Sequence, residues 1–145
     1  MNFDDFKSLV ESKRKSNPIW FALDADKKPS QEDYTKVETK LGAKLPLDYL
    51  RFINEFGGGY FAFSNVFSLD EQSDFNIVNQ NYNYAVIRKG HVLLSENGTG
   101  DFYGYKVVNG DCLPQIRFFD HETQQWYETE FADLFEYLER FALRN

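Results

Sequence analysis

The stretch from Leu45 to Phe61, LPLDYLRFINEFGGGYF, carries the clearest structural pattern in this chain of 145 residues. Proline is favoured in the first turn of a helix, where its missing N–H costs no hydrogen bond, so Pro46 predicts a helix start. Hydrophobic residues then recur at helical spacing and should bury most of the helix surface: Leu47, Tyr49, Leu50, Phe52, Ile53 and Phe56. The three glycines that follow, Gly57, Gly58 and Gly59, end the helix and let the backbone turn into a strand.

Two more helices are predicted before this stretch. Asn2 is suited to cap the first, whose hydrophobic face comprises Phe3, Phe6, Leu9 and Val10. Ser30 is suited to cap the second, which runs to Leu41 and ends at Gly42. Residues 19–23 between them fit a short strand or an irregular hydrophobic segment, and the pattern does not decide which.

Beyond the glycines the hydrophobic period becomes that of strands. The predicted strand segments are 61–67, 85–87, 91–94, 102–108, 115–119 and 126–127, with a short helix over 73–82. Asn109-Gly110-Asp111 is the strongest hairpin signal. Thr129 is suited to cap a last helix, with an apolar face at Phe131, Leu134, Phe135, Leu138, Phe141 and Ala142. This order predicts one α+β domain over residues 1–145, an antiparallel meander with N-terminal helices and a closing C-terminal helix packed on one face.

Composition indicates the cellular compartment in which the protein is expected to work. A single cysteine, Cys112, excludes an intrachain disulfide and fits a reducing compartment. The first ten residues contain acidic side chains and no apolar run, unlike a secretory signal peptide, and no stretch is apolar enough to span a membrane. We therefore expect a cytoplasmic protein.

The charge is unevenly distributed along the chain. The net charge is −7, but residues 1–51 hold ten Lys and Arg against nine Asp and Glu, whereas residues 52–145 hold six against fourteen. A surface of this kind repels nucleic acid and anionic membranes and attracts a cationic partner. The plainer interpretation, that the charge serves solubility, is left open by the sequence.

Several motifs together resemble the SUKH superfamily, named after a fungal regulator of cell-wall synthesis. They are Lys40-Leu41-Gly42, Leu45-Pro46-x-x-Tyr49-x-x-Phe52, the glycines at 57–59, Gly100-Asp101-x-Tyr103 and the helix opening Glu130-Phe131-Ala132-Asp133-Leu134. The resemblance covers nearly the whole chain. The one departure is the first of the three glycines, where the family often has asparagine, and glycine adopts the same left-handed backbone.

The resemblance implies binding rather than catalysis. Many bacterial members are immunity proteins that neutralise a toxin, often a nuclease or another enzyme acting on nucleic acids, and the family shares no catalytic residues or cofactor. The motif residues are then structural: Leu45, Pro46, Tyr49, Phe52, Gly57, Gly58, Gly59 and Gly100. Charge points the same way, because a nuclease presents a basic groove to phosphates and an acidic, aromatic surface complements it.

No motif in the sequence indicates catalysis or a metal site. Phosphate-binding glycine loops and the nucleophile elbow are absent, and the two histidines, His91 and His121, lack the spacing of a metal-binding helix. His91 could meet Asp101 or Cys112 across a hairpin, although an isolated histidine in a strand is usually just exposed. We predict no catalytic, cofactor or metal residues.

Candidate contact residues follow from their chemistry. Asp101, Tyr103 and Tyr105 should alternate onto one sheet face, and other acids cluster near turns; these are Asp70, Glu71, Asp74, Glu96 and Asp111. The alternative is that the tyrosines pack under a helix and the acids are ordinary solvated turn residues.

Three functions are thus open. The first is an immunity protein that blocks a basic toxin domain by stoichiometric docking. The second is a regulatory or scaffold module of a host pathway, which resembles the fungal members. The third is an enzyme that uses carboxylates, with Asp101 or His91 in the reaction.

Overall fold

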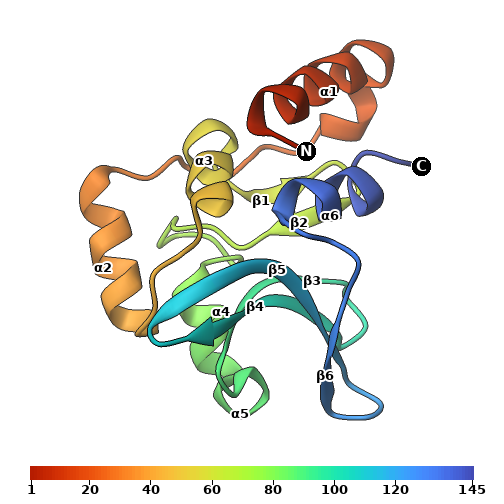
Figure 1. Cartoon of the computed structure of the whole chain (residues 1–145). Coiled ribbons are helices and arrows are strands. Elements are labelled where there is room, and N and C mark those ends of the chain that lie inside the picture. The colour runs from red at the N-terminus through yellow and green to blue at the C-terminus, as the bar shows by residue number, and fades with distance from the viewer.

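The computed structural model describes residues 1–145 and confirms an α+β fold, with helices before and after an antiparallel meander (Figure 1). The helices are α1 (Phe3–Ser16), the 3₁₀ helix η1 (Pro18–Phe21), α2 (Gln31–Leu41), α3 (Leu47–Phe56), α4 (Ile77–Asn83), α5 (Ala85–Arg88) and α6 (Leu134–Phe141). The strands are β1 (Gly59–Phe61), β2 (Ser64–Val66), β3 (His91–Glu96), β4 (Phe102–Val108), β5 (Asp111–Asp120) and β6 (Gln125–Glu128). None of the helices is both long and apolar enough to cross a bilayer.

Strands β3, β4, β5 and β6 form one antiparallel sheet in chain order, and β1 and β2 form a separate hairpin. The predicted turn between β4 and β5 is confirmed: Asn109 and Gly110 both take positive φ, at 51° and 80°. Such a two-residue turn has the twist that antiparallel strands require. The chain after β2 runs along the outer edge of β3, where the Phe67 N–H donates to the Leu94 carbonyl.

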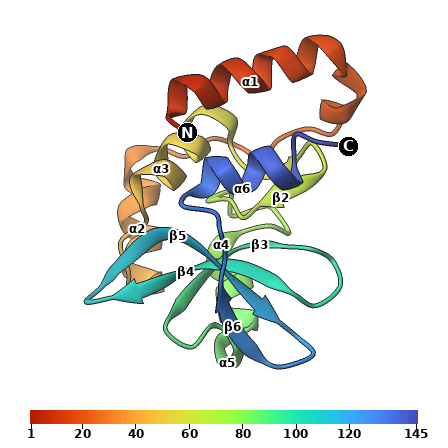
Figure 2. The same cartoon turned by 45° about the vertical axis from the view of Figure 1, so that its right-hand side comes forward.

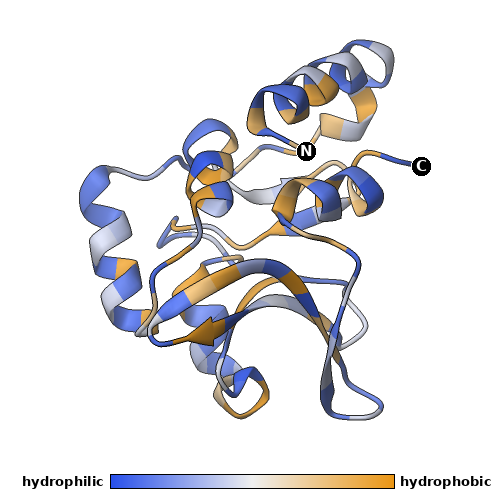
Figure 3. Ribbon diagram, in the orientation of Figure 1, coloured by the Kyte–Doolittle hydropathy of each residue, from blue (hydrophilic) through white to orange (hydrophobic).

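Helix α3 and the closing helix α6 pack on the same face of the sheet, as predicted, and the short helix α5 lies on the other face (Figure 2). On one face, Tyr105 of β4 packs against Tyr49 of α3, with ring centroids 6.4 Å apart. On the other face, the Trp126 indole N–H donates to the Ile87 carbonyl of α5 over 2.9 Å. At the edge, the Asn81 amide of α4 bonds both backbone groups of Leu93. Figure 3 accordingly shows hydrophobic residues recurring along the strands, whereas the outer helix α2 is mainly hydrophilic.

The glycines after α3 are required by a chain segment packed against them. Gly57 has φ of 84°, and a Cβ there would collide with the Asp26 carbonyl oxygen. At Gly59 a Cβ would lie 2.6 Å from the Asp26 carboxylate. The Asp26 N–H also donates to the Gly58 carbonyl. The glycine run is therefore a seat for the loop between η1 and α2.

The other motif residues belong to the scaffold. Leu45, Tyr49 and Phe52 are buried in one hydrophobic core, and the Tyr49 hydroxyl donates to the Phe67 carbonyl over 2.5 Å. Pro46 is the N-cap of α3 rather than its first helical residue. Leu47 was predicted to be buried, which is wrong: its side chain is 61% exposed.

Three local predictions need correction. Residues 85–88 form a short helix instead of a strand, because Tyr84 packs on Phe102 and thereby turns the chain beneath the sheet. The last helix is capped by Asp133, whose side chain accepts from the Glu136 N–H. Thr129 instead bonds the Ile116 carbonyl of β5. Residues 18–21 are neither strand nor irregular but form η1.

Candidate partner-binding surface

The tip of the β1–β2 hairpin is held in an unusual backbone conformation. Ala62 has φ of 49°, in the left-handed region that residues with a Cβ adopt at a cost. The following residue, Phe63, donates its N–H to the Ala142 carbonyl at the end of α6, so the tip is fixed to the C-terminal helix. The Phe63 ring nevertheless stays half exposed. Local strain that presents an aromatic ring is a feature found at functional sites.

This hairpin forms one wall of a groove of about 580 Å³. The β3–β4 turn and the C-terminal part of α6 form the others, and all three elements lie at one end of the molecule (Figure 1). We call this the aromatic groove; its lining residues are Leu23, Tyr60, Ala62, Phe63, Ser64, Asn65, Phe75, Glu96, Asn97, Gly98, Tyr103, Tyr137 and Phe141.

Hydrophobic side chains of the groove remain open to solvent. Leu23 is 62% exposed, Tyr60 51%, Phe63 50% and Phe141 40%. Trp20 extends the surface beyond the groove, with its ring centroid 4.9 Å from that of Phe63. Contiguous exposed apolar surface of this kind marks interaction sites, because the fold gains nothing from leaving it in water.

The turn beside the groove is built around two polar side chains. The Asn97 side-chain oxygen accepts from the N–H groups of Thr99 and Asp101, and its amide donates to the Asp101 carboxylate. The Asp101 carboxylate also accepts from the His121 backbone N–H (2.9 Å) and bonds its ring Nδ1 (2.6 Å). Burial favours the neutral acid, but these bonds outweigh it and lower the pKa of Asp101. The same ring hydrogen bond raises the pKa of His121.

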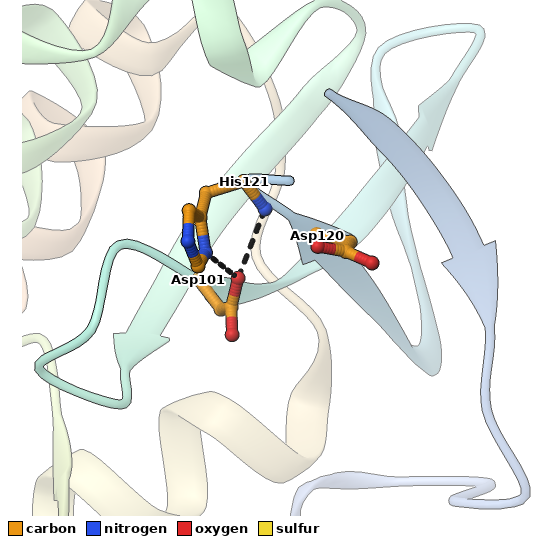
Figure 4. Close-up of side chains that lie close together, drawn as sticks. All are labelled: Asp101, Asp120 and His121. Atoms are coloured by element: carbon orange, nitrogen blue, oxygen red, sulfur yellow. Dashed lines mark hydrogen bonds and ion pairs between the residues drawn. The ribbon is translucent and has the colours of Figure 1, made fainter. Parts of the chain in front are cut away.

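Asp101, Asp120 and His121 form the one group of side chains spaced for a metal ion, with ligand atoms within 4.8 Å of one another. Figure 4 shows the His121 ring turned toward Asp101, while the Asp120 carboxylate lies to one side. The Asp120 side chain accepts from the Glu122 N–H. Hydrogen bonds within the chain thus explain the positions of all three side chains.

The predicted contact residues fall in different places. Glu96 and Tyr103 line the aromatic groove, and Asp74 precedes Phe75, which also lines it. Asp101 lies at the turn beside the groove. Tyr105 was predicted to contact a partner, which is wrong: it is fully buried under α3, because it lies two residues further into the sheet than Tyr103.

The remaining acids lie away from the groove. The Asp70 carboxylate accepts from the N–H groups of Lys27 and Gln72, which gives it a role within the loop. Glu71 pairs with Lys36 of α2 over 3.0 Å, so its charge is neutralised locally. Asp111 is exposed at the start of β5, beside the β4–β5 turn, and does not line the groove.

His91 meets neither Asp101 nor Cys112. Its ring stacks on Trp126 with centroids 3.9 Å apart and 4° between planes. Its Nδ1 lies within hydrogen-bond distance of the Arg88 and Lys89 carbonyls, and burial lowers the pKa of His91. Burial also disfavours the charged form of Cys112. It raises the pKa of this thiol to about 12, so the reactive thiolate is disfavoured.

Sequence reasoning missed the main residues of the groove, namely Tyr60, Phe63 and Phe141. Phe63 lies in a predicted strand and Phe141 on the apolar face of the predicted last helix, so both matched the pattern of core residues. It also missed Asp48 of α3, whose carboxylate accepts from the N–H groups of Tyr49 and Leu134, each over 2.7 Å. Burial outweighs these bonds and raises the pKa of Asp48 to about 6.

Comparison with known proteins identifies the family. Residues 31–138, well over half of the chain, match the family model described as SMI1-KNR4 cell-wall within the SUKH group. No curated protein gives a significant match. The matched region runs from the first residue of α2 to within α6 and includes the glycine seat, the hairpin and the sheet. The chain therefore belongs to the SUKH superfamily, in its SMI1-KNR4 cell-wall family.

Proposed function

We propose that this chain is an immunity protein that binds a cognate toxin domain through the aromatic groove and neutralises it by occluding its active centre. The toxin is expected to be basic, a nuclease or another enzyme acting on nucleic acids, and encountered in the cytoplasm. The mechanism is stoichiometric docking and involves no chemistry by this chain. Membership of the SUKH superfamily supports a protein-binding role, since immunity proteins are common among its bacterial members.

The observation that carries the proposal is the set of half-exposed rings around a rigid groove. Tyr60 packs edge-on against Phe75 and Phe63 against Trp20, each pair with centroids 4.9 Å apart, so the exposed rings are held in place before any partner arrives. Large aromatic side chains in such positions dominate binding energy at protein interfaces. Preorganised rings also lose little side-chain entropy on binding.

Electrostatics supports a basic partner. The net charge is −7, and residues 52–145 carry the whole acidic excess. The hairpin, the β3–β4 turn and α6 all belong to this part of the chain. Opposite net charges accelerate association and make its rate fall as salt rises.

The test is co-expression of this chain with the toxin domain encoded next to its gene, with cell survival and a purified 1:1 complex as readouts. The proposal expects protection by the native chain. Phe63→Ala should weaken binding about tenfold or more, as for a central aromatic contact. Val86→Ala is the matched control, because Val86 is 77% exposed on α5 and outside the groove.

Absence of both protection and a complex would refute the proposal. An equal loss of affinity in Phe63→Ala and Val86→Ala would show that binding does not depend on the groove. Protection lost only with Phe63→Ala supports it. A stable complex with a host protein, together with no effect on the toxin, would instead indicate the regulatory role.

A further inference from the structure

The lining of the aromatic groove contains a single charged side chain among many rings. Of its thirteen lining residues, six carry aromatic rings and one, Glu96, carries a charge. Glu96 is partly buried at the end of β3, and its carboxylate forms no hydrogen bond or ion pair within the chain. Both of its carboxylate oxygens are therefore available to a ligand.

The amide side chains beside Glu96 are already engaged. The Asn65 amide donates to the Glu96 carbonyl and its oxygen accepts from the Glu96 N–H. The Asn97 side chain is engaged in the β3–β4 turn. These bonds fix the backbone at Glu96 and leave its carboxylate as the free charged acceptor in the groove.

The rings around Glu96 also lie in a negative electrostatic environment. Tyr103 contacts Tyr137 and Phe141, with centroid distances of 4.6 and 5.6 Å. Burial raises the pKa of Tyr103, and the negative charge of Asp101 raises it further. Aromatic faces and carboxylates both attract cations, so a cationic guest gains from both at once.

We propose that the groove receives an arginine side chain of the partner, stacked on the aromatic rings and paired through its guanidinium with Glu96. This inference rests on the proposed function and names the chemistry of recognition at the same site. It makes Glu96 the residue that selects a cation among otherwise apolar contacts.

Arginine fits better than lysine for two reasons. Its planar guanidinium stacks on rings and donates two parallel hydrogen bonds to one carboxylate, whereas the lysine ammonium is a compact and strongly hydrated charge. The chain forms the same stacking contact internally, because the Arg14 guanidinium carbon lies 4.7 Å from the centroid of the Phe21 ring. The Arg140 guanidinium lies 6.0 Å from the Phe141 ring but pairs with Glu130 outside the groove.

The test uses three blocked tripeptides as probes, acetyl-Gly-X-Gly-amide with X as arginine, lysine or citrulline, titrated into the full chain and followed by NMR. Citrulline has nearly the shape of arginine without its charge. We expect the arginine peptide to shift the ring resonances of Tyr60, Phe63 and Tyr103 in a saturable manner. The lysine peptide should bind less tightly, and citrulline about tenfold less tightly, as expected when a charge-assisted bidentate bond is lost.

Two variants assign the effect to Glu96. Glu96→Gln should weaken arginine binding about fivefold to tenfold, because the charge of the acceptor is removed. Glu122→Gln is the matched control, since Glu122 is exposed and outside the groove, and it should leave binding unchanged. An unchanged NMR spectrum apart from the groove resonances would show that Glu96→Gln is folded.

Equal binding of the arginine and citrulline peptides, no saturable shift, or no effect of Glu96→Gln would overturn the inference. These outcomes are independent of the toxin experiment. If the toxin is bound and neutralised while the peptides fail, only the arginine inference is lost. If the toxin is not bound but the arginine peptide is, the groove has a cation-binding role with another partner.

Discussion

Tyr49 and Tyr60 are eleven residues apart, on either side of the glycine seat, and the fold uses them in opposite ways. Tyr49 is fully buried and its hydroxyl is bonded to the Phe67 carbonyl. Tyr60 is half exposed, and its hydroxyl has no partner within the chain. The same residue type is therefore part of the buried core on one side of the seat and leaves a half-exposed ring in the aromatic groove on the other.

The comparison separates stability from recognition within one short segment. Substitutions in the buried region should change the free energy of unfolding, whereas substitutions in the aromatic groove should change binding. Measurements at four positions test how complete this separation is.

The largest effect is expected for Tyr49→Ala. Removal of a fully buried aromatic side chain leaves a cavity, and the free energy of unfolding should fall by about 3–5 kcal/mol. Tyr49→Phe keeps the ring but leaves the Phe67 carbonyl without its donor, which should cost about 1–3 kcal/mol. Urea denaturation measures both. A loss below about 1 kcal/mol for Tyr49→Ala would place Tyr49 outside the stabilising core.

Asp48 gives the next largest effect, as a dependence on pH. Its pKa is about 6 in the folded protein against 3.8 for the ordinary group, so the native state binds this proton more tightly than the unfolded chain. Its contribution is therefore most favourable below pH 4 and is lost as the pH rises through 6, by about 3 kcal/mol.

Asp48→Asn removes the titration while keeping the shape of the side chain. The stability of the native protein relative to this variant should fall between pH 4 and pH 7, measured by urea denaturation at each pH. A difference that is constant with pH would mean that Asp48 has the same proton affinity in both states.

Ala62→Gly tests the strained hairpin. Glycine adopts the positive φ of this position at no steric cost, so the variant should be more stable by about 1 kcal/mol. Thermal denaturation gives the change. Gly110→Ala, at the other hairpin with positive φ, is the reciprocal control and should destabilise. A loss of stability for Ala62→Gly would show that the Ala62 conformation is not strained.

The smallest effect on stability is expected for Phe63→Ala, the variant that should most affect binding. Its ring is 50% exposed, and surface substitutions usually change stability by about 0.5 kcal/mol or less. Urea denaturation alongside the binding assay provides both values. A loss comparable to that of Tyr49→Ala would abolish the distinction between scaffold and groove.

Most of the fold follows from local patterns in the sequence. Capping residues, glycine stops and the Asn109-Gly110 turn predict the main helices and the meander. Each of these signals acts on the backbone within a few residues of itself, so it can be recognised in the sequence. The segment at Ala85–Arg88 is different: its β-branched residues favour a strand, but Tyr84 and Trp126 hold it in a helical turn under the sheet. Tertiary contacts override local preference there.

The groove was less accessible to prediction, because it joins segments that are distant in the sequence. The chemistry of Glu96 and Tyr103 predicts that they contact a partner, and both line the groove in the structure. Phe63 and Phe141 lie far apart in the sequence but both line the groove, and the Phe63 N–H donates to the carbonyl of Ala142, which follows Phe141. Register alone also did not reveal that Tyr105 lies beneath α3 whereas Tyr103 reaches the rim.

The hydrogen bond between Asp48 and the first turn of α6 has a consequence for biosynthesis. It joins residues 86 positions apart, and α6 in turn anchors the tip of the β1–β2 hairpin. During translation, Asp48 emerges from the ribosome long before Leu134, whose N–H group donates to the Asp48 carboxylate. The tip of the hairpin thus stays unanchored until α6 has been synthesised, and the aromatic groove is complete only then.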